Sequence, residues 1–118
     1  AARLCNEFEI IGSFTFMVGF PIDADKNGKE TKDLMEIILG NYPKHEIRVH
    51  IWAPYPGTEL YPIALQRGFE PPKTLEEWAG YEYNKPQTPW INEELVKMLE
   101  YTSQWNLKSE KFNYADKN

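Results

Sequence analysis

The sequence predicts an α/β fold in which two parallel strands are joined by a helix. Residues 10–20 and residues 46–53 both alternate between two kinds of side chain with the period of a strand. Between them, residues 30–39 place Leu34, Ile37 and Ile38 on one helical face. A connection that contains a helix joins neighbouring strands in parallel. We therefore expect a βαβ unit, followed by shorter helices.

The two strands differ in the side chains that they place opposite the apolar face. The first strand places serine, threonine, methionine and glycine there. The second, which is rich in β-branched residues, places three larger polar or aromatic residues there: Arg48, His50 and Trp52. We interpret these three as candidate substrate-facing residues. The alternative is that they face water on an uncovered sheet, which is the commoner cause of such alternation.

Loops and caps separate these elements. Pro21 ends the first strand, and residues 22–29 are expected to form a polar loop. Gly40 and Asn41 tolerate the left-handed conformation that ends many helices. Residues 54–57 (Pro-Tyr-Pro-Gly) predict a turn at the carboxyl end of the second strand, which is where α/β folds bind ligands.

Three short helices are expected after that turn. Thr58 is expected to cap a helix that runs to about Gln66 and is stopped by Gly68. Residues 74–77 (Thr-Leu-Glu-Glu) form a capping-box pattern. Asn92 is expected to cap the last helix. One side of that helix carries Leu95, Met98, Leu99 and Thr102.

Two parallel strands make an incomplete sheet. Parallel sheets bury both faces, and two strands alone leave both edges open. The chain also opens without a methionine, at residues that resemble the end of a helix. Either the domain assembles with another chain or the remaining strands are missing, and we favour a segment taken from a larger protein.

Composition excludes several partners. The 118 residues carry a net charge of −5 with scattered acidic residues, so nucleic acid is not expected as a partner. No apolar run is long enough for a bilayer, and no signal peptide is evident. The single cysteine, Cys5, cannot form an internal disulfide, which favours a cytoplasmic location.

Two strings carry a resemblance to a known family. Residues 17–21 read Met-Val-Gly-Phe-Pro, with Glu-Thr-Lys-Asp-Leu at residues 30–34. One helix later, residues 53–61 read Ala-Pro-Tyr-Pro-Gly-Thr-Glu-Leu-Tyr. In this order they resemble the later barrel segments of radical S-adenosylmethionine enzymes. Residues 68–79 resemble the subgroup with an upstream cobalamin (B12)-binding domain, and the likeness extends to about Trp90.

The resemblance implies a partial TIM-like (β/α) barrel, of which residues 1–105 are the C-terminal part and residues 106–118 a polar tail. Such barrels hold S-adenosylmethionine on a [4Fe–4S] cluster and generate a 5′-deoxyadenosyl radical. In the subgroup, methyl transfer or carbon-skeleton rearrangement follows. The cofactor-binding residues that the resemblance implies are Gly19, Phe20, Pro21, Glu30, Thr31, Pro54, Tyr55, Pro56 and Gly57.

The chain departs from the family in two places. The family ligates its cluster through Cys-x3-Cys-x2-Cys, whereas this chain has only Cys5, so no cofactor is expected in this chain alone. Residues 22–29 are also an insertion where the family has about one residue. They separate Glu30 and Thr31 from the first string, which these two residues follow closely in the family. The expected partner is the missing remainder of the barrel or a second copy of the chain. The alternative function is a non-catalytic module that dimerises or docks through an exposed sheet edge.

Metal-binding motifs are incomplete. Residues 23–28 match the first half of an EF-hand loop, but Glu30 and Leu34 stand where that loop needs an apolar residue and a bidentate glutamate. A polar turn is therefore expected there instead. His45 and His50 have no partner at ligand spacing, so no metal site is predicted.

Overall fold

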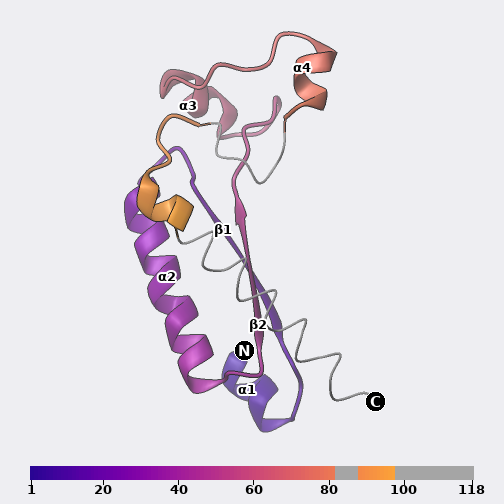
Figure 1. The fold of residues 1–118 in the computed structure, drawn as a ribbon, viewed down its shortest axis with the longest axis vertical. Coiled ribbons are helices and arrows are strands. Elements are labelled where there is room, and N and C mark those ends of the chain that lie inside the picture. The colour runs from indigo at the N-terminus through magenta and orange to yellow at the C-terminus, as the bar shows by residue number, and fades with distance from the viewer. Residues whose placement is uncertain (82–87, 98–118) are drawn as a thin grey trace.

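The computed structural model describes residues 1–81 and 88–97 of the chain. The elements, in chain order, are α1 (Ala2–Glu7), β1 (Ser13–Val18), α2 (Ala24–Asn41), β2 (Glu46–Ile51), α3 (Tyr61–Gln66) and α4 (Leu75–Ala79). Residues 93–97 are also helical. The strands run from α1 at one end of the molecule toward α3 and α4 at the other (Figure 1).

β1 and β2 pair in parallel, which confirms the predicted βαβ unit. The register places Ser13 opposite Glu46 and Val18 opposite Ile51. Both strands are shorter than the alternating segments of the sequence. The fold is therefore mixed α/β with a two-stranded parallel sheet in the described residues.

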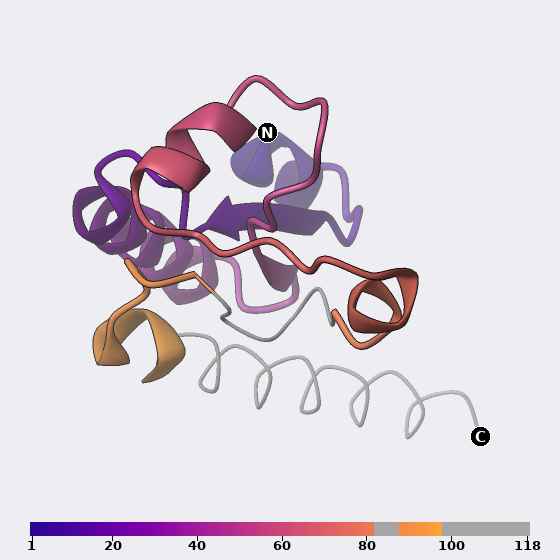
Figure 2. The ribbon, with the colours of Figure 1, turned by 90° about the horizontal axis from the view of Figure 1, so that it is seen from above.

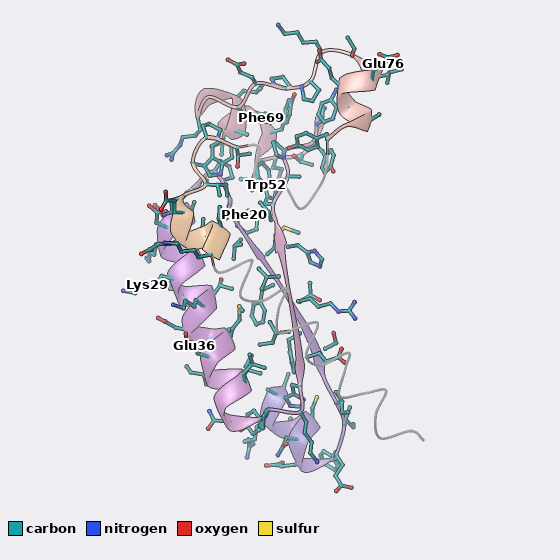
Figure 3. All side chains as sticks on the ribbon, in the orientation of Figure 1. Phe20, Lys29, Glu36, Trp52, Phe69 and Glu76 are labelled. Atoms are coloured by element: carbon teal, nitrogen blue, oxygen red, sulfur yellow. The ribbon has the colours of Figure 1, made fainter. Side chains whose placement is uncertain are left out.

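Helix α2 covers one face of this sheet, as both ribbon views show (Figures 1 and 2). Met35 and Ile38 of α2 pack with Ile47 of β2 in a buried cluster, and Phe14 and Phe16 of β1 pack against it. The apolar face of the strands is thus buried against α2, but the predicted helical face is only partly correct. Ile38 is buried with Met35, whereas Leu34 and Ile37 are 47% and 59% exposed, because the face turned to the strands lies to the other side of Ile38. The charged side chains of α2, such as Lys29 and Glu36, point away from the strands (Figure 3).

The expected loop at residues 22–29 is wrong from Ala24 onward, because α2 already begins there. Asp23 precedes the helix in the left-handed conformation, and its carbonyl accepts the N–H of Asn27. Ala24 and Gly28 are buried under Leu95, which comes from a distant part of the sequence. Burial of the two small residues therefore outweighs the turn preference of the polar residues around them.

The first short helix begins later than predicted, and Thr58 does not cap it. The Thr58 hydroxyl donates to the Tyr55 carbonyl at 2.9 Å, and Leu60 is the residue that precedes α3. The end of α3 is as predicted. Gly68 has a φ of +90°, and the Phe69 N–H donates to the Ala64 carbonyl in the pattern of a Schellman motif.

The end predicted for α2 is wrong, because the helix continues through Gly40 to Asn41 and neither residue has a positive φ. The two other predicted N-terminal caps are confirmed. The Glu77 N–H donates to the Thr74 hydroxyl at 3.2 Å at the start of α4. The Leu95 N–H donates to the Asn92 side-chain oxygen at 2.9 Å, at the start of the helical residues 93–97. Met98, Leu99 and Thr102, which were expected on that last helix, lie outside the described residues, as does the tail 106–118.

A buried histidine ties α1 to the start of both strands. His45 Nδ1 accepts the Gly12 N–H at 3.1 Å, and Nε2 lies 2.8 Å from the Ala2 carbonyl. Because Nδ1 is an acceptor, the ring is neutral and donates through Nε2. The ring also makes an edge contact with Phe14 and a tilted contact with Tyr42. His45 is thus a structural residue with both nitrogens used.

Replacing His45 by alanine is expected to lower the free energy of unfolding by about 1–3 kcal/mol, because a buried N–H and a carbonyl lose their partner. The measurement is urea denaturation followed by circular dichroism. Lys44→Ala, at the exposed neighbouring position, is the control and is expected to change stability by less than about 0.5 kcal/mol. Equal stability of the two variants would contradict the role of His45.

No helix among residues 1–81 and 88–97 is long and apolar enough to cross a membrane.

Candidate functional site

The two strings that resemble the cofactor-binding segments of the family lie at the carboxyl ends of the strands. Residues 17–21 include the last two residues of β1, and residues 53–61 follow β2. Since the strands are parallel, both ends lie at the same edge of the sheet. The Trp52 N–H donates to the Val18 carbonyl at 2.8 Å, which extends the pairing one residue past β2. Beyond it, Gly19 and Pro54 are both buried. The structure therefore brings residues 19–21 and 54–57 to one end of the molecule.

This end is closed by residues 88–97, which we call the strand-end cover. The indole N–H of Trp90 donates to the Gly19 carbonyl at 2.9 Å. Gly19 has a φ of +81°, and Ile91 fills the space beside it, so that an added Cβ would lie 2.6 Å from Ile91 Cδ1. The Asn92 amide donates to the Asp25 carboxylate of α2. The cover therefore meets both β1 and α2 through specific contacts.

Leu95 gives the cover a second contact with a glycine. An added Cβ on Gly28 would lie 2.4 Å from Leu95 Cδ2. Leu95 also packs with Val18 and Ala24 in a buried cluster. From sequence alone, Asn92 is predicted only as a cap and Leu95 only as part of a helical face. Nothing local to Gly19 or Gly28 indicates that these glycines receive side chains from the cover.

An aromatic cluster lies directly beyond the strand ends. Trp52, Ala64 and Phe69 form its buried centre, with Phe20 packed against it. The labelled side chains of Phe20, Trp52 and Phe69 gather there in Figure 3. The Trp52 ring lies between those of Phe20 and Trp90, at centroid distances of 6.2 and 6.4 Å. Trp52, a predicted substrate-facing residue, thus packs in this cluster at 9% exposure.

Three further rings meet at the outer side of this cluster. Tyr55 stacks on Trp78 with ring centroids 6.3 Å apart, and Tyr81 makes edge contacts with both. Tyr55 remains 45% exposed, so part of its surface is open to a ligand. Burial raises the pKa of Tyr81 to about 12, and the neighbouring Tyr55 and Tyr61 contribute further in the same direction.

The raised pKa of Tyr81 predicts a loss of stability at alkaline pH. The folded state holds the Tyr81 proton more tightly than the unfolded state, whose tyrosine has the ordinary pKa of 10.0. The stabilisation from Tyr81 is therefore complete below pH 10.0 and is lost as pH rises toward about 12. Tyr81→Phe should show a smaller fall in unfolding free energy over that range, and its absorbance titration should lack a tyrosine that ionises near pH 12. Tyr42→Phe is the control, and an unchanged titration in Tyr81→Phe would contradict the assignment.

Glu30 and Thr31 do not stand directly after the first string. They lie in the second turn of α2, roughly 9–10 Å along the helix axis from its first residue. Glu30 is exposed and Thr31 is half-buried. Arg48 and His50 lie in β2, where Arg48 is exposed and His50 half-buried. The structure thus gathers the two strand-end segments but leaves Glu30, Thr31, Arg48 and His50 on other parts of the molecule.

A metal cluster does not fit the residues of this chain. Cys5 is the only cysteine, and it lies half-buried in α1, at the end of the molecule opposite the strand-end segments (Figure 1). Within residues 1–81 and 88–97, no three histidine, cysteine or acidic side chains are grouped so that they could hold a metal ion. The single cysteine cannot supply the three thiolates that a [4Fe–4S] cluster of this kind requires.

No protein-family model, curated protein or solved structure matches the chain.

Proposed function

We propose that this chain is the later part of a radical S-adenosylmethionine barrel and contributes part of the wall that holds the adenosyl group. The observation that carries the proposal is the position of residues 17–21 and 53–61 in the fold. Both strings follow neighbouring parallel strands, one crossover helix apart, and meet at the carboxyl edge where barrels of this kind bind ligands. Two short strings that resembled the family by chance would not be expected to lie at the same edge of a parallel sheet.

The residues present fit an adenosyl ligand on one side of this edge. Ile91 fills the side of Gly19 on which a Cβ would lie. The open surface is therefore that of residues 55–57, which are exposed and include the ring of Tyr55. An aromatic ring of this kind stacks on a base. When bound to a reduced cluster, S-adenosylmethionine supplies a 5′-deoxyadenosyl radical. This chain would orient the adenosyl group and exclude water from it, and the cluster would be held elsewhere.

The first test is the reading frame upstream of Ala1. The proposal expects a Cys-x3-Cys-x2-Cys string within a barrel-sized stretch before this segment. The whole encoded protein, reconstituted anaerobically with iron and sulfide and reduced with dithionite, should then convert S-adenosylmethionine to 5′-deoxyadenosine and methionine. A reading frame that lacks the cysteine string would overturn the proposal.

A matched pair of variants in that longer protein tests the contribution of this chain. Tyr55→Ala is expected to weaken S-adenosylmethionine binding about 5- to 100-fold, since stacking on a base is worth about 1–3 kcal/mol. Leu75→Ala, which removes a side chain that is 83% exposed, should leave binding unchanged. Equal affinities of the two variants would remove Tyr55 from the site.

The alternative is a non-catalytic module that associates through its sheet. The observation that favours it is the lack of charged residues along the free edge of β1, since an uncharged edge can pair with another strand.

A further inference from the structure

The hydrogen-bonding groups of β1 divide cleanly between its two edges. The Gly12 carbonyl accepts the Glu46 N–H, and the Val18 carbonyl accepts the Trp52 N–H. Along a strand, successive residues direct their N–H and C=O groups to opposite sides. The even-numbered residues of β1 therefore bond to β2. Ser13, Thr15 and Met17 direct theirs to the other edge, which pairs with no strand in the described residues.

This free edge lacks the features that normally protect a sheet edge. Charged side chains, proline and bulges keep strands from pairing with other chains. Residues 10–18 contain none of the charged residue types and no proline. The residues that lead into the strand, Ile10 and Ile11, are 58% and 55% exposed. β2, in contrast, carries Glu46 and Arg48, which form an ion pair at 4.0 Å.

We propose that a second copy of this chain pairs with this edge, β1 against β1 in antiparallel orientation, about a two-fold axis at Thr15. Because only odd-numbered residues have outward N–H and C=O groups, the pairing must join odd-numbered residues to each other. An axis at Thr15, the middle of the three outward-bonding residues of β1, meets this condition and uses all three: Thr15 faces Thr15, and Ser13 faces Met17 of the second copy. This pairing places Phe14 opposite Phe16 of the second copy, at a position without hydrogen bonds where opposing side chains are closest. Aromatic and threonine pairs at such positions are stabilising.

We infer that the strand that pairs with this edge is β1 of a second copy, because two uncharged β1 strands can pair without electrostatic repulsion. Self-pairing of β1 brings no charged side chains together, whereas antiparallel self-pairing of β2 brings the charged side chains of Glu46 and Arg48 to the interface. The two-fold axis stands perpendicular to the sheet, so both α2 helices remain on the same face of a four-stranded sheet with order β2-β1-β1-β2. In the longer protein proposed above, an earlier barrel strand would take this edge. The dimer is thus a property of the 118-residue chain and does not rest on the proposed function.

Disulfide trapping tests the pairing and its register. With Cys5 replaced by serine, Thr15→Cys places two thiols across the axis, at about 5.5 Å between Cα atoms, which suits a disulfide. The matched control is Arg48→Cys in the same background, because Arg48 lies directly beside Thr15 in the register but one strand farther from the axis. Mild oxidation should convert most of Thr15→Cys, and little of Arg48→Cys, to a covalent dimer. Equal crosslinking of the two variants would overturn the proposed register.

Sedimentation equilibrium tests the pairing without oxidation. The unmodified chain should show twice the monomer mass of 13.8 kDa. Thr15→Lys places two ammonium groups at the axis and should raise the dissociation constant about tenfold or more, less so at high salt. Thr15→Val should remain dimeric. A folded chain that stays at 13.8 kDa would overturn the dimer and leave the proposed function standing, since that function depends on the cysteines encoded upstream.

Discussion

Trp52→Ala is expected to lower the free energy of unfolding by about 3–5 kcal/mol, because it leaves a large cavity in a packed cluster. The Trp52 side chain packs with Ala64 and Phe69, and its ring lies between those of Phe20 and Trp90. No smaller residue fills that volume, so the neighbouring aromatic residues lose contacts that water cannot replace. The measurement is urea denaturation at pH 7 by circular dichroism, which does not depend on tryptophan fluorescence.

Two control variants separate packing from a role at an open sheet face. Trp52→Phe keeps a ring in the cluster and should lose markedly less stability than Trp52→Ala. Arg48→Ala, on the exposed part of β2, should change stability by less than about 0.5 kcal/mol. A loss at Trp52 as small as that at Arg48 would mean that the aromatic cluster does not stabilise the fold.

Gly19→Val is expected to lower the free energy of unfolding by about 2–6 kcal/mol, because two costs add at one position. A β-branched residue at the Gly19 φ of +81° costs about 1–3 kcal/mol in backbone strain. Overpacking against Ile91 Cδ1 and Ile51 Cγ2, which lie 2.6 and 3.3 Å from the added Cβ, costs about 1–3 kcal/mol more. The measurement is again urea denaturation.

Further variants divide the two costs. In Gly19→Ala, adding Ile91→Ala should relieve the overpacking but leave the backbone strain, so the two effects should not be additive. Gly40→Ala in α2 is the matched control, since nothing lies within 4 Å of its added Cβ. That change should stabilise the chain by about 0.5–1 kcal/mol. Destabilisation of Gly19→Val no greater than that of an exposed substitution would contradict the contact between the cover and β1.

The parts of the fold that could be predicted are those that depend on local patterns. Alternation in residues 13–18 and 46–51 reflects a strand face that packs against α2 within one βαβ unit. The predicted helical face is correct only at Ile38, since Leu34 and Ile37 are exposed and Met35 is buried instead. The Thr74 and Asn92 caps depend on residues three positions away. In each case the sequence contains both partners of the interaction within one turn or one strand.

The parts that could not be predicted depend on distant residues. At the start of α2, Gly28 lies against Leu95, whereas the segment itself is polar and rich in turn-forming residues. Alternation groups Trp52 with Arg48 and His50. Trp52 is nevertheless buried, because Ala64 and Phe69, which come later in the sequence, pack against it just past the end of β2. The closure of Gly19 by Trp90 and Ile91 is likewise a long-range contact.

The strand-end cover also has a consequence for synthesis of the chain. The βαβ unit is complete at Ile51, but the residues that close its carboxyl end are made last among the described part of the chain. At about 5–20 residues per second, Trp90 follows Ile51 by about 2–8 s. During that interval Val18 and Gly19 lack the Leu95 and Ile91 side chains that bury them. A purified chain truncated before residue 88 should therefore bind a chaperone that recognises apolar surface, and the full chain should not.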